Sequence, residues 1–295
     1  MKTKLSRRSA LQTLTGGAAV LAAASSLSHR LTAAEAAADA KLKGRINHSV
    51  CKWCYEKIPL DDFCKASQEI GLQSVELLEV KDFPTLKKYG LTCAVVSGVP
   101  GGIGSGLNRV ENHDKIVEFM ERTLPAAAEF GAPTVICFSG NRNGQDDEKG
   151  LENCTIGLKR IAPIAEKNKV TVIMELLNSK LNHKDYQCDY SKWGVELCKR
   201  VGSERFKLLY DIYHMQIMEG DICATIKANH QYFGHYHTGG VPGRNEIDDT
   251  QELNYPRIMQ AIVDSGFKGF VAQEFIPKRP DALASLKQGV LICDV

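Results

Sequence analysis

The chain has 295 residues, 43% of them hydrophobic, which is enough for one large core and within the usual size of an α/β barrel. Lys and Arg (37) nearly balance Asp and Glu (35), so the formal net charge is +2. Charges of both signs are interspersed, with no basic stripe and no acidic block. This pattern argues against nucleic-acid binding and a disordered charged tail, and it leaves a small-molecule substrate as the expected partner.

The beginning of the chain differs from the rest. Arg7 and Arg8 precede a mildly apolar run over residues 14–27 that is rich in Ala and Gly, and small residues follow up to Ala36. Paired arginines, a weakly hydrophobic run and an A-x-A site, in this order, resemble a bacterial twin-arginine export signal. The alternative is an amphipathic helix that belongs to the mature fold.

We therefore expect a signal peptide over residues 1–36, a single barrel domain over residues 37–295 and a periplasmic location. The apolar run is shorter than the roughly 20 residues of a permanent span, so no stable membrane span is expected after cleavage. A retained signal that anchors the protein to the membrane is the other outcome. The sequence is also compatible with a homo-oligomer.

Ten cysteines are spread along the chain, and in an exported protein they could form disulfides. Several fall in predicted core strands or on helix faces, where a free thiol behaves as a small apolar side chain. Cys51 and Cys54 form a C-x-x-C pair, which is found in redox centres and in halves of zinc sites. Residues three apart on a strand point to opposite faces, so structural or near-site thiols are the favoured interpretation.

From residue 45 the chain alternates between short apolar runs and amphipathic stretches, and glycine often follows the amphipathic stretches where a helix C-cap is expected. Predicted strands cover residues 46–53, 74–80, 91–97, 134–139, 170–177, 206–213, 232–238 and 267–275. Predicted helices cover residues 59–70, 83–89, 112–130, 150–168, 190–201, 216–228, 256–265 and 281–291.

Eight β-α units in order predict an α/β fold of the (β/α)8 TIM-barrel type. The strands are rich in Val, Ile and Leu and lack strict alternation, as is typical of parallel strands covered by helices. A doubly wound open sheet is the rival architecture, and it usually gathers its ligands at one switch point. Here polar residues follow the fifth, sixth, seventh and eighth strands, which favours a barrel mouth.

Four of these strand ends carry a residue type that binds metals. Glu175 follows Val-Thr-Val-Ile-Met, Asp211 follows Leu-Leu-Tyr, His237 lies in Gly-His-Tyr-His, and Glu274 follows Val-Ala-Gln. Each could instead be a strand-end residue with a local partner. Together, three carboxylates and one imidazole suit a divalent ion such as Mg2+, Mn2+ or Co2+, with Zn2+ as a further option. His235 shares a strand face with His237 and could pack beneath it or support it.

Further residues are expected to contact the substrate. Arg244 closes a glycine-rich loop after His237 and could bind a carboxylate through two hydrogen bonds, although a solvated surface Arg is the alternative. His214 follows Asp211 by three residues and is either a substrate contact or the start of the next helix. Trp53 could stack on the substrate or cover the core, and Asn178 is a weaker candidate. The loop over residues 98–106 is interpreted as a lid or mouth loop, not a phosphate cradle.

These motifs resemble the xylose-isomerase-like barrels, and most of all their hydroxypyruvate isomerase branch. The resemblance rests on Glu175-Leu-Leu-Asn178, Asp211-Ile-Tyr-His214, Val-Pro-Gly-Arg244 and Gln-Glu274-Phe-Ile-Pro, and it covers about residues 45–290. It implies that a divalent metal is held by Glu175, Asp211, His237 and Glu274. It also implies that Glu175 and Glu274 are the acid/base pair and that His214 and Arg244 contact substrate.

The function expected from the residues and the resemblance is a metal-dependent isomerase. It would convert a small α-hydroxycarbonyl compound through an enediolate, as in the aldose–ketose conversion of hydroxypyruvate to tartronate semialdehyde. A ketose 3-epimerase, or a lyase acting on a 3-keto sugar or glycoside, uses the same chemistry, but Leu181 stands where the epimerase branch has a further Glu. The remaining alternatives are phosphodiester hydrolysis, disfavoured by the near-neutral charge, and a non-catalytic exported protein that binds a sugar or an acid.

Overall fold

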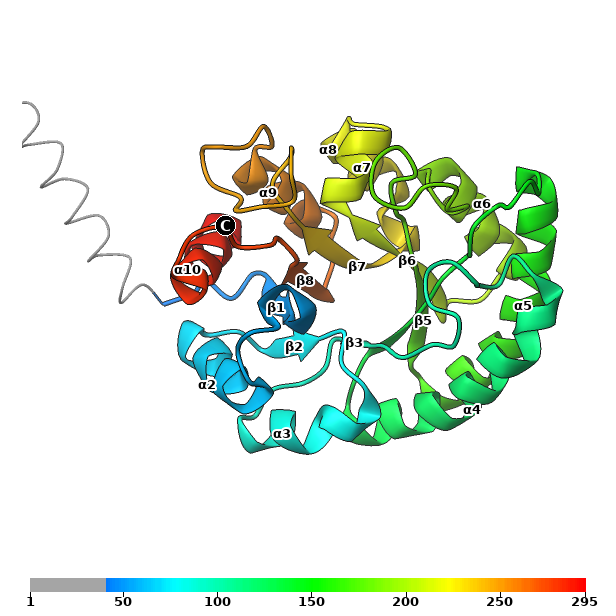
Figure 1. The fold of residues 1–295 in the computed structure, drawn as a ribbon, viewed down its shortest axis with the longest axis horizontal. Helices are drawn as coiled ribbons and strands as arrows, with labels where there is room; N and C mark the ends of the chain where they lie inside the picture. Colours follow the sequence, from blue (N-terminus) through cyan, green and yellow to red (C-terminus); the bar gives the residue numbers. More distant parts are fainter. Residues whose placement is uncertain (1–40) are drawn as a thin grey trace, which may run out of the picture. The chain divides into compact units, whose positions relative to one another are not determined.

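The computed structural model describes residues 41–295, so the predicted signal over residues 1–36 lies outside the described part of the chain. Short strands form the centre and helices surround them (Figure 1). The strands are β1 Asn47–Cys51, β2 Ser74–Glu76, β3 Val95–Val96, β4 Thr134–Cys137, β5 Thr171–Glu175, β6 Phe206–Asp211, β7 Phe233–Thr238 and β8 Phe270–Gln273. Their order along the chain is the predicted one.

The α-helices are α2 Leu60–Ile70, α3 Phe83–Lys88, α4 His113–Phe130, α5 Asp147–Asn168, α6 Ser191–Val201, α7 Ile212–Met218, α8 Ile222–Asn229, α9 Tyr255–Asp264 and α10 Ala282–Cys293. Short 3-10 helices lie at Lys52–Tyr55, Val80–Asp82, Val110–Asn112 and His230–Tyr232. Glycine ends α2, α4 and α6 in the left-handed conformation, as predicted. Helix α5 begins earlier than predicted because the side chain of Asp146 accepts a hydrogen bond from the backbone N–H of Lys149.

All neighbouring strands are parallel, in the order β2-β1-β8-β7-β6-β5-β4-β3. The two end strands, β2 and β3, meet through isolated parallel bridges between Ser74 and Thr92 and between Leu78 and Val96. These bridges join β2 to β3, the eighth pair of neighbouring strands, and close the barrel. The predicted (β/α)8 architecture is confirmed, and the open doubly wound sheet is not formed.

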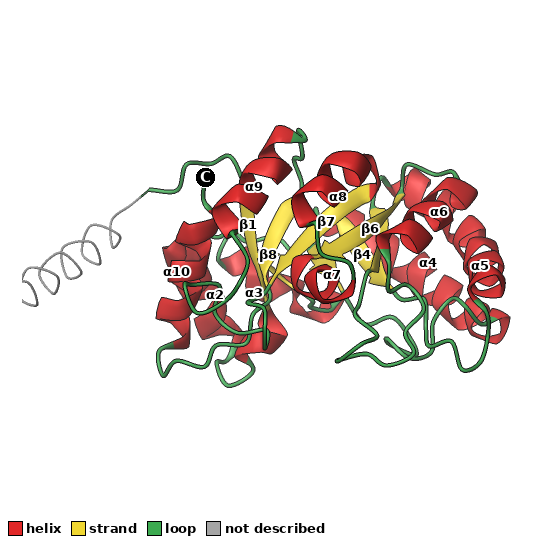
Figure 2. Cartoon of the chain, turned by 90° about the horizontal axis from the view of Figure 1, so that it is seen from above, coloured by secondary structure: helices red, strands yellow, loops and turns green. Residues whose placement is uncertain are grey.

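The barrel interior beneath the mouth is apolar. Val95, Ile136, Ile173 and Leu209, from four adjacent strands, form a buried cluster. Side chains two residues further along a strand share its face, so Glu175 lies above Ile173, and Asp211 lies above Leu209. The carboxyl ends of the strands therefore place polar groups on top of an apolar floor. Helices line both sides of the strands when the barrel is seen from the side (Figure 2).

Strand β6 is shorter than predicted, because the chain enters α7 immediately after Asp211. The Asp211 side chain accepts a hydrogen bond from the backbone N–H of His214 and caps this helix. His214 therefore lies in the first turn of α7, and it is at the same time fully buried at the mouth. All ten cysteines are free thiols. Within residues 41–295, every helix is too short or too polar to cross a membrane.

Candidate active site

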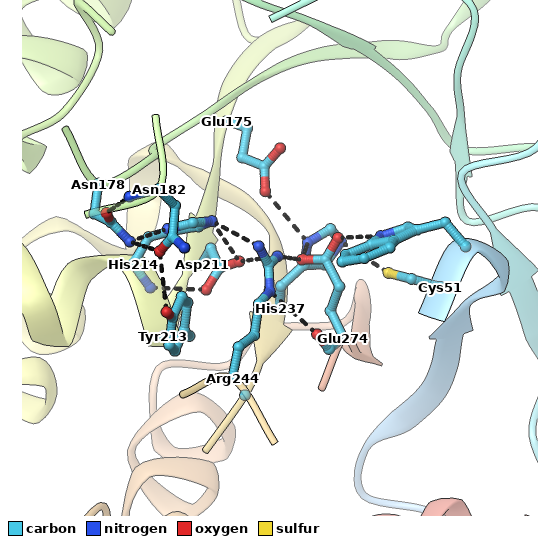
Figure 3. A network of polar contacts seen from close by, with 12 residues as sticks. Cys51, Glu175, Asn178, Asn182, Asp211, Tyr213, His214, His237, Arg244 and Glu274 are labelled. Carbon is cyan, nitrogen blue, oxygen red and sulfur yellow. Dashed lines mark hydrogen bonds and ion pairs between the residues drawn. The ribbon is translucent and has the colours of Figure 1, made fainter. Parts of the chain in front are cut away.

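The four residues predicted as metal ligands lie together at the carboxyl end of the barrel. Glu175 ends β5, Asp211 ends β6, His237 is the penultimate residue of β7, and Glu274 follows β8. One ligand atom from each lies within 4.8 Å of the others, and all four residues are buried. Figure 3 shows their side chains pointing toward one another.

The contacts inside this group suit a shared cation. Nδ1 of His237 lies 2.7 Å from a carboxylate oxygen of Glu274 and 3.5 Å from one of Glu175. Nδ1 of His237 thus faces carboxylate oxygens, and the Oε1 atom of Glu175 is buried without a hydrogen-bond partner. Buried polar atoms are normally satisfied, and hard divalent cations prefer carboxylate oxygens with imidazole as a tolerated ligand. The donor set therefore fits Mg2+, Mn2+ or Co2+, and Zn2+ is chemically compatible.

A fifth polar residue of the mouth, Glu76 at the end of β2, was not predicted. Its Oε1 atom lies 2.8 Å from Nε2 of His235 and 2.9 Å from Nε2 of His237, and its side chain is fully buried. Burial alone would raise the pKa of Glu76, but the two histidines lower it to about 2. Burial would lower the pKa of His237, but without a cation Cys51 and the surrounding carboxylates raise it well above its usual value. When a metal is bound, the ionised Glu76 would keep the proton of His237 on Nε2, so that the Nδ1 lone pair would be directed at the metal.

Arg244 lies among the ligands, and it is buried more deeply than an Arg on the surface of the mouth would be. Its guanidinium contacts the carboxylates of Asp211, at 3.2 Å, and Glu274, at 2.5 Å. Its Nη1 lies 3.1 Å from Nε2 of His214, and its φ of +58° is unusual for a residue with a side chain. The predicted contact with a substrate carboxylate would therefore compete with these internal partners.

His214 and Asn178 form one unit beside Arg244. The Asn178 oxygen accepts hydrogen bonds from the backbone N–H groups of Leu181 and Asn182, so its NH2 group donates to Nδ1 of His214 at 2.6 Å. Burial, together with the charge of Arg244, lowers the pKa of His214 well below its usual value. His214 is therefore neutral, and its single proton is assigned to Nε2, which lies 3.6 Å from a carboxylate oxygen of Asp211. The guanidinium of Arg244 also lies beside Nε2, but it can only donate hydrogen bonds.

Trp53 lies in the 3-10 helix that follows β1, and its side chain contacts the carboxylate of Glu274. Its indole N–H donates to Oε1 of Glu274 at 2.8 Å, and the Arg244 guanidinium carbon lies 5.2 Å from its ring centroid. Trp53 thus fixes both the acidic and the basic partner of the site. All four predicted substrate contacts (Trp53, Asn178, His214 and Arg244) lie in or beside the ligand group.

The carboxylates of the site have pKa values displaced in opposite directions. Burial and the nearby Glu274 raise the pKa of Glu175, and burial also raises the pKa of Asp211 to about 8 against the opposing effect of Arg244. Burial acts in the same way on Glu274, but Arg244 and His237 overcome it and hold the Glu274 pKa well below its usual value. Two carboxylates with opposite shifts in one site are the arrangement expected of an acid/base pair.

A cavity of about 370 Å³ opens beside the ligand group. Glu175, Glu274, Arg244 and His183 form its polar end. The predicted mouth loop over residues 98–106 contributes Ile103, so this loop does border the cavity. His183 also packs against His214, with ring centroids 5.2 Å apart. The arrangement can bind a small molecule against two carboxylates and a cation.

Comparison with known proteins agrees with this architecture. Residues 64–290 match the family model described as the xylose isomerase-like TIM barrel. The chain is 34% identical over 234 residues to the 2-oxo-tetronate isomerase of Cupriavidus necator, covering 74% of this chain and 87% of that protein. It is 28% identical over 235 residues to the human protein named "Putative hydroxypyruvate isomerase", covering 77% and 78%.

Solved structures show the same fold at lower identity. The AP endonuclease, family 2, from Brucella melitensis superposes with a TM-score of 0.72 at 23% identity, covering 83% of this chain and 97% of that one. The 3-keto-D-glucoside 4-epimerase of E. coli superposes with a TM-score of 0.70 at 16% identity, covering 83% and 98%. The matched family model spans most of the barrel, and the chain therefore belongs to the xylose isomerase-like TIM barrel family.

Proposed function

We propose that this protein is a divalent-metal-dependent isomerase that moves a proton between adjacent carbons of an α-hydroxycarbonyl compound. The observation that carries the proposal is the buried group of Glu175, Asp211, His237 and Glu274, which opens onto a cavity through its two glutamates. The names of the curated relatives, 2-oxo-tetronate isomerase and hydroxypyruvate isomerase, support the same reaction class. Hydroxypyruvate, with tartronate semialdehyde as its product, is the reference substrate.

The metal would be held by these four side chains, and when bound it would polarise the carbonyl and acidify the neighbouring C–H bond. Glu274 accepts the proton from carbon, and Glu175 returns a proton to the adjacent carbon. His214 directs its Nε2 proton toward the substrate oxygen that gains charge. Trp53 and Arg244 keep the Glu274 carboxylate in place through contacts at 2.8 Å and 2.5 Å.

The test follows deuterium wash-in from D2O into hydroxypyruvate and into other small ketoacids and ketoses with Mn2+ present. The wild-type protein is expected to exchange the hydrogen next to the carbonyl. Glu274→Gln should lose most of this exchange while still binding Mn2+ in a calorimetric titration. Exchange at the wild-type rate in this variant would disprove the acid/base role of Glu274.

A second candidate is a ketose 3-epimerase, or a lyase acting on a 3-keto sugar or glycoside. The cavity of about 370 Å³ favours it, because a three-carbon acid would leave much of that volume empty. Product analysis separates the two functions. An isomerase shifts the carbonyl, an epimerase inverts one carbon, and a lyase releases a leaving group. A purified protein that binds no divalent ion, and whose Tm does not rise when one is added, would instead favour a non-catalytic binding protein.

A further inference from the structure

The cavity beside the ligand group has two chemically different walls. Its polar side chains have partners in or beside the ligand group: Glu175, Glu274, Arg244, His183 and Trp53, whose indole N–H donates to Glu274. Ser97 is the remaining lining residue with a polar group. The opposite wall consists of apolar side chains that offer no hydrogen bond: Leu77, Ile103, Ile136, Phe138 and Leu177. The cavity is thus polar on the side of the ligand group and mainly apolar on the side that Leu77, Ile136 and Phe138 form.

Leu77 joins this wall by adopting a backbone conformation that is unfavourable for leucine. Side chains alternate between the two faces of a strand, yet Glu76 and Leu77 both point into the barrel: Glu76 reaches His235, and Leu77 packs against the buried cluster around Ile136. The chain achieves this with a φ of +57° at Leu77, which is a genuine outlier for a bulky side chain. Strain of this kind persists where the surrounding structure requires the side chain.

The five apolar side chains of this wall offer a hydroxyl group no hydrogen bond, and Ser97 is the single side-chain hydroxyl among the residues that line the cavity. A polyhydroxylated chain placed there would give up hydrogen bonds to water and receive none in return, which is unfavourable for each buried hydroxyl. An alkyl or aryl group would instead cover Leu77, Phe138 and Leu177 and release water from apolar surface. The internal pairing of Arg244 with Asp211 and Glu274 also leaves the wall without an unpaired cation for a second acidic group.

We propose that the substrate carries an apolar alkyl or aryl substituent, which packs on this wall while the α-hydroxycarbonyl group lies at the ligands. The inference rests on the proposed function, because it takes the ligand group as the place where the reacting atoms bind. It narrows the substrate class to α-hydroxycarbonyl compounds that do not carry a polyhydroxylated chain. Hydroxypyruvate would then be a minimal substrate that leaves the wall uncovered.

The test measures equilibrium binding of hydroxamates, which chelate metals as an enediolate would, to the Mn2+-loaded protein by calorimetry. Butyrohydroxamate has two more methylenes than acetohydroxamate, and burying them should tighten Kd by roughly tenfold. Benzohydroxamate should bind at least as tightly as butyrohydroxamate. Glycerohydroxamate, whose chain carries two hydroxyls, should bind no more tightly than acetohydroxamate. Equal or tighter binding of glycerohydroxamate than of butyrohydroxamate would overturn the inference and leave the proposed function standing.

A substitution at Leu77 tests whether this wall causes the preference for butyrohydroxamate over acetohydroxamate. Leu77→Asn suits the left-handed backbone and makes the wall polar, so the tenfold preference for butyrohydroxamate should fall to about twofold or less while acetohydroxamate binds as before. Leu181→Asn makes the same change at a leucine that is 65% exposed, and it should keep the wild-type preference. An unchanged preference in folded Leu77→Asn would overturn the inference. Failure of every hydroxamate to bind the wild-type protein would refute the metal-centred function itself.

Discussion

Replacing Glu76 by Gln tests whether the buried carboxylate prepares His237 for metal binding. Glu76 Oε1 lies within 2.9 Å of Nε2 of both His235 and His237, so one negative oxygen serves two imidazoles. Glutamine keeps the shape of the side chain but removes the charge. Its amide oxygen holds an imidazole proton less strongly, because hydrogen bonds to charged groups contribute about 1.5–3 kcal/mol and neutral ones about 0.5–1.5 kcal/mol.

The expected consequence is a loss of metal affinity. Replacing a residue that orients a metal-binding histidine usually weakens binding by about 10- to 100-fold, which corresponds to about 1.4–2.8 kcal/mol. The Nε2 proton is less firmly held in the variant, so the tautomer that presents a lone pair at Nδ1 is less populated. Because His237 still supplies Nδ1, binding should be weakened and not abolished.

The assay is calorimetric titration of the metal-stripped protein with Mn2+, supported by the gain in Tm at saturating Mn2+. Glu219→Gln is the matched control, since Glu219 accepts hydrogen bonds from Ser191 and is not one of the clustered ligands. The control should bind Mn2+ as the wild type does. Wild-type affinity in folded Glu76→Gln would refute the role given to this carboxylate.

Four further outcomes are expected. Adding Mn2+ to the stripped protein at about 100 times its Kd should raise Tm by roughly 5–10 °C, because the ion relieves repulsion among the buried carboxylates, and a scanning calorimeter records this. Burial lowers the pKa of His48 against the opposing effect of Asp294, so the unfolded chain takes up a proton that the folded chain does not. The free energy of unfolding should therefore fall as pH drops below about 6.5, with a shallower slope in His48→Asn, as urea titrations at several pH values would show. Dithiothreitol should leave Tm unchanged, since all ten cysteines are free thiols. If the predicted export signal operates, replacing Arg7 and Arg8 by Lys should retain the protein in the cytoplasm, which cell fractionation checks.

The sequence could predict the barrel because the evidence for it is local. Each strand is a short apolar run, and the helices that end at Gly71, Gly131 and Gly202 stop where a left-handed residue is required. The ligand group was predictable for a related reason. Parallel strands end on the same side of a barrel, so polar residues that close four consecutive strands must converge.

The role of Glu76 was not predictable in this way. The expected strand over residues 74–80 places Glu76 in its interior, whereas the observed strand ends there because Leu77 adopts a left-handed backbone. Leucine gives no local signal for that conformation. The partner of Glu76, His235, lies 159 residues further along the chain, and only the closed barrel brings the two together. The internal ion pairs of Arg244 are non-local in the same sense.

The seam between β2 and β3 has a consequence for how sharply the cavity can discriminate. Leu77 and Ser97 border the cavity from the two sides of this seam, and the backbone hydrogen bonds from Leu77 N–H to Val95 O and from Ser97 N–H to Leu78 O join these two sides. Backbone N–H groups that are held in this way exchange slowly, so the amide of Leu77 should be as well protected as those of the other barrel strands. A wall that is fixed by the barrel itself cannot widen for a bulkier group, and its apolar side chains cannot supply a hydrogen bond. Selection by size and selection by polarity should therefore both be strict at this site.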